Sequence, residues 1–451
     1  MQALKVTIPG EFYDSQIYNG KLYLWKINGS LVTINWDMLV DKIVAPEELE
    51  VVLRFSLQYS DELYGNPLMQ DAEVRNLMKS KFQKLSELAV EIKKQDLDNC
   101  TINEQDNPLP FPHADSVIYY ETMYVGSQSG VSASKCNAGQ WVEQSVEKAE
   151  RLFDMPVLSI SASHRTLAVA AGDAGLYDYS LASNSTKKNI DPFNRSGNHC
   201  NLARWLYPSI FGSSYFNDGY FADFKTKKRS NVQKEQSSQK TGQAGSSIGL
   251  LEKGENQKPV SHYERTFQRL ISSDEIFAKP ELKFDQANNG TDASDTTFTW
   301  GVQDKVCSIT GNLVQLAQYM PQSRSSRQRF KDLGSVEIAG SNGEIISADS
   351  SFFGIILEQD DGLLVVSSSL KSEFLKGEPV NWHVFPKSRN YSNQLHVIHE
   401  DALHIYSFNH DYFVDQSTKK LGISVASGEK LNIRSRAQEN TNAEEQEDVP
   451  F

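Results

Sequence analysis

Short apolar runs alternate with glycine-containing turns along this chain, and residues 342–369 show the pattern most plainly. Asn342-Gly343 and Asp361-Gly362 are dipeptides that accept the positive φ angles of a tight hairpin turn, and an apolar run follows each of them. A third run between them is more continuously apolar, which is typical of a strand buried on both faces. The stretch therefore predicts three strands, at 344–348, 352–357 and 363–366.

Similar turn signals recur elsewhere. Asn19-Gly20 and Asn28-Gly29 lie nine residues apart, so we expect a meander of strands in the N-terminal region. Residues 51–59 are predicted to form a further strand. Hairpins spread over the chain without alternating helices exclude a parallel α/β sheet, and they leave sandwiches, barrels and propellers.

One segment follows a different period. Between residues 71 and 94, apolar residues recur at three- and four-residue steps: Val74, Leu77, Met78, Phe82, Leu85, Leu88, Ala89 and Ile92. The spacing predicts one amphipathic helix of about six turns and hence a helical insertion at about 70–95. This helix either packs on the rim of the sheet core or binds a partner.

Two segments lack the large apolar residues that a packed core requires. Residues 225–261 are rich in Lys, Gln, Ser and Gly, and we predict that they are a disordered basic insertion in one loop. Residues 435–451 end in EEQEDVPF, and we predict that they are a mobile acidic tail. The remainder of 1–434 is predicted to be a single domain.

Size selects among the all-β architectures. Without the two insertions and the tail about 367 residues remain, and repeats of about 40 to 50 residues correspond to seven or eight blades. We therefore predict an all-β fold, a β-propeller of about seven four-stranded blades. Such a ring leaves only short outer edges that could pair with other chains.

Three strings carry a family resemblance: VIYYETMYVGSQSGVSAS, TLAVAAGDAGLYDYSL and FTWGVQDKVCSITGNLVQL. They resemble degenerate blades of the WD40-like β-propeller superfamily, and the resemblance covers about two thirds of the chain. No Gly-His pair or Trp-Asp pair recurs at blade spacing, and Trp36-Asp37 is a single instance. The resemblance implies an intracellular platform for other proteins, although a fold is weak evidence of a function.

The amino-acid composition limits the kinds of partner and the cellular compartment that we expect. The net charge of −13 disfavours a broad phosphate-binding surface, because affinity for nucleic acid comes mainly from clustered Lys and Arg. The four cysteines lie far apart without a CxxC pair, so we interpret them as free thiols in a reducing compartment. The first residues show no basic and then apolar leader, and no long apolar run occurs. We therefore expect a cytoplasmic protein that does not associate with a membrane.

Five of the nine histidines lie within 28 residues: His383, His396, His399, His404 and His410. On a strand, His396 and His399 point to opposite faces, whereas His396 and His404 could pair across a turn at Glu400-Asp401. We expect a structural or interfacial role for this cluster, with a metal site as the alternative.

Clustered carboxylates offer another chemistry, that of a paired acid and base for glycoside hydrolysis: Glu358, Asp360, Asp361, Glu400, Asp401, Asp411 and Asp415. Most of them belong to predicted turns, where Asp and Glu have a conformational role. The chain contains no nucleophile elbow, phosphate-binding loop or dinucleotide fingerprint. We predict no catalytic residues, no cofactor and no metal.

The sequence thus favours a non-catalytic scaffold or adaptor that binds one or more proteins in a larger assembly. Exposed aromatic and arginine side chains at hairpin ends commonly anchor such contacts, and basic side chains extend them. The candidate partner-binding residues are Trp205, Tyr207, Trp382, Arg389, Tyr391, Lys227, Lys228 and Arg229. Two alternatives remain: a hydrolase or glycan binder at the central channel, and a nucleic-acid-associated subunit that uses the basic 225–240 arm.

Overall fold

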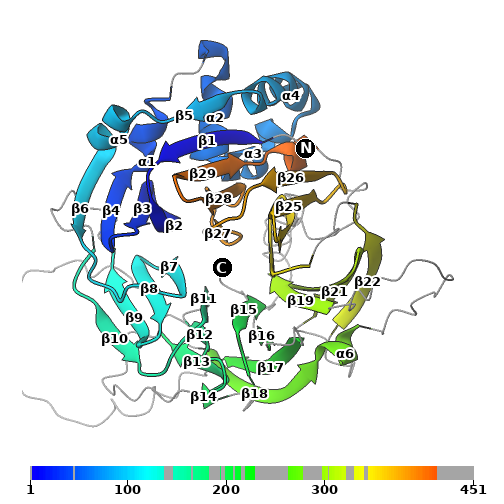
Figure 1. Cartoon of the computed structure of the whole chain (residues 1–451). Helices are drawn as coiled ribbons and strands as arrows, with labels where there is room; N and C mark the ends of the chain where they lie inside the picture. The colour runs from blue at the N-terminus through cyan, green and yellow to red at the C-terminus, as the bar shows by residue number, and fades with distance from the viewer. Residues whose placement is uncertain are drawn as a thin grey trace, which may run out of the picture.

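The chain folds as a ring of seven sheets around one axis in a computed structural model (Figure 1). The structure describes residues 3–43, 46–136, 146–163, 166–181, 193–194, 199–206, 209–214, 219–228, 263–277, 297–302, 304–320, 330–339 and 344–413. The first strand of each sheet packs against the first strands of the neighbouring sheets, so these strands form the inner wall. The seven-bladed all-β propeller expected from the sequence is confirmed.

Six blades contain four antiparallel strands in chain order from the axis outwards. The first two blades consist of β2 (Phe12–Tyr18), β3 (Lys21–Lys26), β4 (Ser30–Asn35) and β6 (Thr101–Asp106), and of β7 (Asp115–Tyr119), β8 (Thr122–Ser127), β9 (Gly130–Lys135) and β10 (Glu150–Phe153). The next two consist of β11 (Ser159–Ser163), β12 (Thr166–Ala170), β13 (Leu176–Ser180) and β14 (Phe193–Asn194), and of β15 (Leu202–Leu206), β16 (Ser209–Ser213), β17 (Gly219–Lys228) and β18 (Tyr263–Ser272). The fifth and sixth consist of β19 (Thr297–Val302), β20 (Lys305–Thr310), β21 (Leu313–Tyr319) and β22 (Phe330–Glu337), and of β23 (Ser347–Ser351), β24 (Gly354–Gln359), β25 (Gly362–Ser367) and β26 (Ser372–Lys376).

The seventh blade closes the ring with strands from both parts of the chain. β27 (Asn381–Val384), β28 (Gln394–Ile398) and β29 (Ala402–Ser407) pair in order, and β1 (Leu4–Pro9) adds to β29 in antiparallel register. A short strand, β5 (Ala89–Glu91), pairs in parallel with the outer side of β1. The N-terminal strand is therefore held on both edges.

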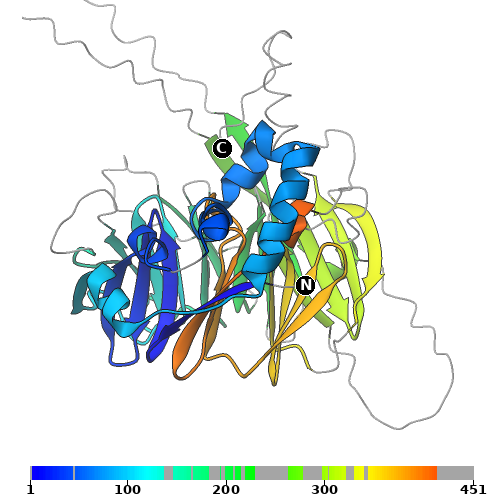
Figure 2. The ribbon, with the colours of Figure 1, turned by 90° about the horizontal axis from the view of Figure 1, so that it is seen from above.

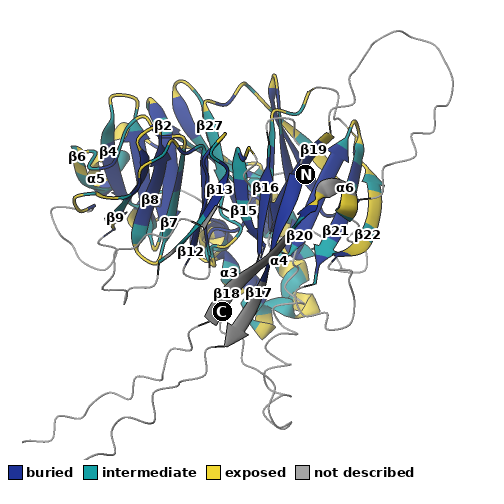
Figure 3. Cartoon of the chain, turned by 90° about the horizontal axis from the view of Figure 1, so that it is seen from below, coloured by how far each residue is buried: buried dark blue, intermediate teal, exposed yellow. Residues whose placement is uncertain are grey.

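The inner and middle strands of the blades are mostly buried on both faces because neighbouring blades pack face to face, as the dark blue strands of Figure 3 show, whereas outermost strands such as β22 and β26 are largely exposed or half-buried. Residues 352–357, the run predicted to be buried on both faces, are all buried. The turn between β8 and β9 requires Gly130, whose φ is +114° and whose Cβ would lie 1.8 Å from the Phe153 carbonyl oxygen. The predicted hairpins here and around Asp361-Gly362 are confirmed.

The turn signal at Asn342-Gly343 did not mark a hairpin. These two residues lie outside the described residues, but the flanking strands β22 and β23 belong to different blades. The predicted strand at 344–348 begins only at Ser347. A glycine turn between two blades has the same local sequence as a turn within a hairpin, so the dipeptide alone does not distinguish them.

The helical insertion is longer than predicted and divides into several short elements between β4 and β6. They are α1 (Trp36–Val40), η1 (Glu47–Leu49), α2 (Glu50–Leu57), α3 (Ser60–Gly65), η2 (Pro67–Gln70), α4 (Ala72–Ser86), β5 and α5 (Lys94–Cys100). The two remaining elements are α6 (Ser273–Ile276) and η3 (His410–Phe413).

Two predictions in this region were wrong. Residues 51–59 are mostly helix rather than strand, because Val52, Leu53 and Leu57 share one buried helical face. The helix predicted over 71–94 ends at Ser86, because the following residues pair with β1 and the Ile92 amide donates to the Thr7 carbonyl at 2.8 Å. A tertiary hydrogen-bonding edge overrides the helical period there.

The helices α2, α3 and α4 stand together on one face of the ring, where Figure 2 draws them in blue. Several hydrogen bonds tie the insertion to itself and to the closing blade. Among them are Trp36 Nε1 to the Leu57 carbonyl at 2.7 Å, Ser60 Oγ to the Asn390 carbonyl at 2.9 Å, Asn393 Nδ2 to the Ser56 carbonyl at 2.9 Å and Arg75 Nη2 to the Tyr412 carbonyl at 2.8 Å. The insertion is an integral part of the propeller.

The basic insertion is shorter than predicted at its start. Residues 225–228 belong to β17 and pair with β18 in continuous register, so their backbone is ordered rather than disordered. Strand pairing with a distant segment stabilises a polar run that has no core of its own. The rest of the predicted insertion, residues 229–261, lies outside the described residues, and so does the predicted tail at 435–451.

Candidate functional site

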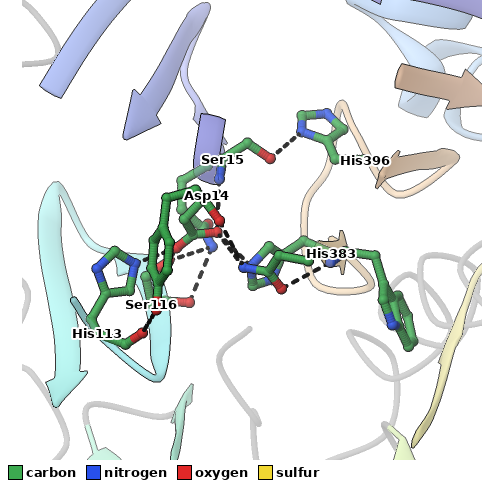
Figure 4. Close-up of polar contacts among 10 residues, drawn as sticks. Asp14, Ser15, His113, Ser116, His383 and His396 are labelled. Carbon is green, nitrogen blue, oxygen red and sulfur yellow. Dashed lines mark hydrogen bonds and ion pairs between the residues drawn. The ribbon is translucent and has the colours of Figure 1, made fainter. Parts of the chain in front are cut away.

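A network of polar side chains surrounds Asp14, which lies on the innermost strand β2 and is fully buried (Figure 4). One carboxylate oxygen accepts from His113 Nε2 at 2.7 Å and from Ser116 Oγ at 2.6 Å. The other accepts from His383 Nε2 at 2.6 Å and from Asn381 Nδ2 at 3.2 Å. A single carboxylate therefore joins three consecutive blades beside the point of ring closure.

The charges in this network support one another. Burial opposes ionisation of Asp14, but the positive charge of His383 and the hydrogen bonds from His113 and His383 hold the pKa of the carboxyl well below its usual range. Burial likewise opposes protonation of His383, but Asp14 outweighs it and raises the pKa of this histidine. Asp14 and His383 thus form a buried ion pair between two blades.

His396 lies next to this pair but is neutral. Its Nδ1 shares a hydrogen bond of 3.1 Å with Ser15 Oγ, and its Nε2 lies 3.3 Å from Gln394 Oε1. Burial, together with the smaller effect of the His383 charge, lowers the pKa of His396 to about 3, although Asp14 opposes the shift. The neutral imidazole of His396 accepts a hydrogen bond from Ser15 and donates one to Gln394, so both of its nitrogens have a partner.

Replacing His396 with glutamine is expected to weaken the acid sensitivity of the fold. Between pH 6.5 and about 3 the unfolded chain binds a proton at this histidine that the folded chain does not bind, so stability falls as pH falls. Glutamine does not titrate, and the stability that the parent loses through His396 between pH 7 and pH 4.5 corresponds to about 2.5 kcal/mol. Urea unfolding at pH 7 and pH 4.5 measures it, and an equal pH dependence in both proteins would contradict the assignment. His404, with a pKa lowered to about 4, leaves a residual slope.

A second group of side chains reaches across the axis. Arg204 of β15 lies with its Nη2 and its Nε each 3.2 Å from Asp349 Oδ2 of β23, and its Nη1 donates to Ser159 Oγ of β11 at 3.2 Å. These three strands belong to different blades. The guanidinium therefore bridges non-adjacent parts of the inner wall.

Lys387 completes this group from the segment between β27 and β28. Its Nζ donates to the Ala162 carbonyl of β11 at 3.1 Å. Solvent reaches part of this side chain, but the surrounding protein desolvates its ammonium group, and together with the nearby Arg204 charge this lowers the pKa of Lys387 to about 7. The charge of Asp349 opposes this shift.

The charged side chains near the axis form hydrogen bonds and ion pairs with one another. Asp14 accepts four side-chain hydrogen bonds, and Arg204 is held by Asp349 and Ser159. Within the described part of the chain, no group of three or more His, Cys, Asp or Glu side chains is arranged to hold a metal ion. The chemistry of this arrangement is the joining of blades.

The predicted contact residues have different surroundings. Trp205 and Tyr391 are only 2% and 3% exposed, so the expectation that they present aromatic rings at the surface was wrong. Trp205 packs in a core between blades, and Tyr391 Oη accepts from the Gly20 amide at 2.9 Å. Large rings next to turns pack between blades, where they bury more apolar area than at a rim.

Trp382 is half-buried, and its Nε1 donates to Glu358 Oε2 at 2.8 Å in the preceding blade. Arg389 is exposed, with its Nε 3.5 Å from Asp61 Oδ2 of α3. Tyr207 and Arg229 lie outside the described residues, and for Lys227 and Lys228 the structure describes the backbone in β17. Partner binding by these six residues stays a prediction.

The pairing of His396 with His404, which the sequence left open, does not occur. His396 lies opposite Ile405 in the β28–β29 register, so His396 and His404 point to opposite faces of the blade. The His404 ring lies 5.0 Å from that of His399. Of the clustered carboxylates, Glu358 accepts from Ser347 and Trp382, and Asp411 accepts from Ser368 Oγ at 2.8 Å.

Reasoning from the sequence did not select Asp14, although a signal was present. Asp14, Ser15 and Gln16 form a polar triplet inside an otherwise apolar strand. Three consecutive polar residues at the centre of a buried strand require partners from elsewhere in the chain, because an unpaired buried polar group is costly.

Fold and site together define a seven-bladed β-propeller whose inner wall is joined by ion pairs between blades, one around the buried Asp14 and one, Arg204–Asp349, that is half-buried. No protein-family model matches the sequence, and neither does any curated protein sequence. Among solved structures, the chain is similar to the β-propeller domain of Cps50 (Swd1) from Myceliophteria thermophila, with 9% identity, a TM-score of 0.36, and coverage of 66% of this chain and 97% of that one.

Two further solved structures are similar over most of the chain. Raptor from Chaetomium thermophilum has 8% identity and a TM-score of 0.46, and the match covers 90% of this chain and 29% of that one. The extracellular domain of the one-component system BT4673 from B. thetaiotaomicron has 12% identity and a TM-score of 0.41, with coverage of 91% and 40%. The chain therefore spans less than half the length of these two structures.

Proposed function

We propose that this propeller is a non-catalytic adaptor that binds another protein through its helical insertion in the cytoplasm. The observation that carries the proposal is the exposure of two leucines, Leu68 on η2 and Leu77 on α4, which are 71% and 69% exposed. α4 packs against β1 of the closing blade, and η2 packs against α3 and α4, so both leucines belong to elements that are packed against the rest of the fold. Apolar side chains on a fixed surface are typical of a protein interface.

The axial network supports the same conclusion. Its charged groups form hydrogen bonds and ion pairs between blades, and this arrangement makes the ring a rigid support. The four cysteines are buried free thiols, which is consistent with a reducing compartment. In the part of the chain that the structure describes, no helix is long and apolar enough to cross a membrane.

The test is a tagged pull-down from the native host at moderate salt, with the double variant Leu68→Ser/Leu77→Ser beside the parent. We expect a stoichiometric partner that the parent retains and the double variant loses by at least ten-fold. The matched control is Ile27→Ser/Val380→Ser, which removes two similarly exposed apolar side chains from the blades. A partner retained by the leucine variant, or lost equally by the control, would contradict the proposal.

A further inference from the structure

Two cationic side chains from different blades, Arg204 and Lys387, bind to the same inner strand, β11. Arg204 Nη1 donates to Ser159 Oγ at 3.2 Å, and Lys387 Nζ donates to the Ala162 carbonyl at 3.1 Å. Ser159 and Ala162 lie three residues apart on this strand, which corresponds to about 10 Å. Lys387 follows β27, which lies across the axis from β11 in Figure 1. The two cations are therefore neighbours at the axis of the ring.

The carboxylate beside these cations is already engaged. Asp349 Oδ2 lies 3.2 Å from both Nε and Nη2 of Arg204, and Asp349 Oδ1 accepts from the Ser350 amide at 2.7 Å. The pKa of Lys387 is lowered first by desolvation and then by the charge of Arg204, and Asp349 opposes the shift with a smaller effect. Among the described residues, the charges that act on Lys387 therefore leave an excess of positive charge around its ammonium group.

Both cations also retain N–H groups for a further acceptor. An ammonium group carries three N–H donors and a guanidinium group carries five. In the part of the chain that the structure describes, Lys387 donates once, and Arg204 donates to Asp349, Ser159 and the Ala203 carbonyl. Solvent reaches the two side chains, since that of Arg204 is 27% exposed and Lys387 is an exposed residue. A small solute with acceptor oxygens can therefore approach them.

We propose that Arg204 and Lys387 bind a small free oxyanion, such as sulfate or inorganic phosphate, at the axis of the propeller. The oxyanion accepts charge-assisted hydrogen bonds from the donors that the protein leaves unused, and these are stronger than hydrogen bonds between neutral groups. It also supplies the negative charge that the surroundings of Lys387 lack. This inference goes beyond the adaptor function and does not depend on it.

Sulfate is the probe, because it keeps both of its charges over the pH range of the test. In titration calorimetry of the whole chain at pH 6 and constant ionic strength, we expect one sulfate to bind. Lys387→Met is expected to weaken this binding by about ten-fold or more, because it removes a charge-assisted hydrogen bond. Lys376→Met, which removes an exposed lysine from the outermost strand β26, is the matched control and is expected to leave the affinity unchanged. Absence of sulfate binding to the parent, or equal weakening by the two variants, would overturn the proposal.

The pH dependence of binding distinguishes Lys387 from its neighbours. An anion favours the protonated ammonium group, and the pKa of Lys387 is lowered to about 7, so the parent is expected to bind sulfate about ten-fold more weakly at pH 9 than at pH 6. Lys387→Arg keeps its charge over this range, so its affinity is expected to fall by no more than about three-fold. The other charged groups here are Asp349, His383 and the two carboxylates that act on His383, Asp14 and Asp115. An equal fall in both proteins would assign the dependence to His383, whose pKa is raised, and would refute the role of Lys387.

A nucleotide distinguishes a free anion from a phosphate group carried on a larger molecule. Adenosine monophosphate is expected to bind no more tightly than inorganic phosphate at the same pH, because Arg204 and Lys387 provide donors for the oxyanion alone. Binding of the nucleotide that is tighter by about ten-fold or more would reveal contacts with the nucleoside and would overturn the free oxyanion as the ligand.

Discussion

Replacing Asp14 with alanine is expected to lower the free energy of unfolding by about 3 to 5 kcal/mol, because it leaves a buried histidine charge without its partner. Asp14 is fully buried and accepts from His113, Ser116, Asn381 and His383, so one substitution removes contacts between three blades. Urea unfolding followed by tryptophan fluorescence measures the change. Asp360→Ala, at an exposed turn, is the control and is expected to change stability by less than about 0.5 kcal/mol.

The pH dependence of this variant identifies the ion pair. The pKa of Asp14 is lowered, so its contribution to stability is present above the carboxyl's unfolded pKa of about 3.9 and is lost as pH falls. The pKa of His383 is raised, so its contribution is complete below its unfolded pKa of about 6.5 and is lost as pH rises through the folded value. The destabilisation by Asp14→Ala is therefore expected to be greatest between about pH 4 and 6.5. A penalty independent of pH would show that packing, rather than the ion pair, accounts for the loss.

The second large effect is expected at Trp36, the first residue of α1. Its side chain is fully buried, and its indole N–H donates to the Leu57 carbonyl at the end of α2 at 2.7 Å. Trp36→Ala removes a large side chain from the core shared by the blades and the helices, and the expected loss is about 3 to 5 kcal/mol. Thermal unfolding followed by circular dichroism measures it.

Two variants separate the causes of this loss. Trp36→Phe keeps most of the apolar volume but removes the indole donor, and the expected loss is about 1 kcal/mol, because Gln394 Nε2 still donates to the Leu57 carbonyl at 3.0 Å. Met38→Ala, at an exposed position of the same helix, is expected to cost less than about 1 kcal/mol. If Trp36→Ala destabilises the chain no more than Met38→Ala, the insertion is not anchored through this residue.

Local patterns were sufficient for most of the blades. The apolar run at 352–357 predicted a strand buried on both faces, and the run after Asp361-Gly362 predicted a hairpin strand; the structure contains both, as β24 and β25. The same reasoning was wrong at residues 51–59, where a short apolar run fits a buried strand and a buried helix equally well. It was also wrong beyond Ser86, where pairing with β1 ends the helix. The spacing of apolar residues and the choice of turn residues are local properties of the sequence. The strand or helix against which a segment packs is not.

The sequence by itself determined the fold class, the approximate number of blades and the presence of a helical insertion, because each depends on composition and short-range spacing. Only the tertiary structure decided the environment of single residues. Asp14 meets His113 and His383, which are remote in the chain, because closure of the ring brings their strands together beside the axis. Packing of the blades against their neighbours buries Trp205 and Tyr391. Leu68 and Leu77 are exposed because other side chains of the helices fill the core. Burial and pairing depend on which surfaces meet, and a local pattern does not contain that information.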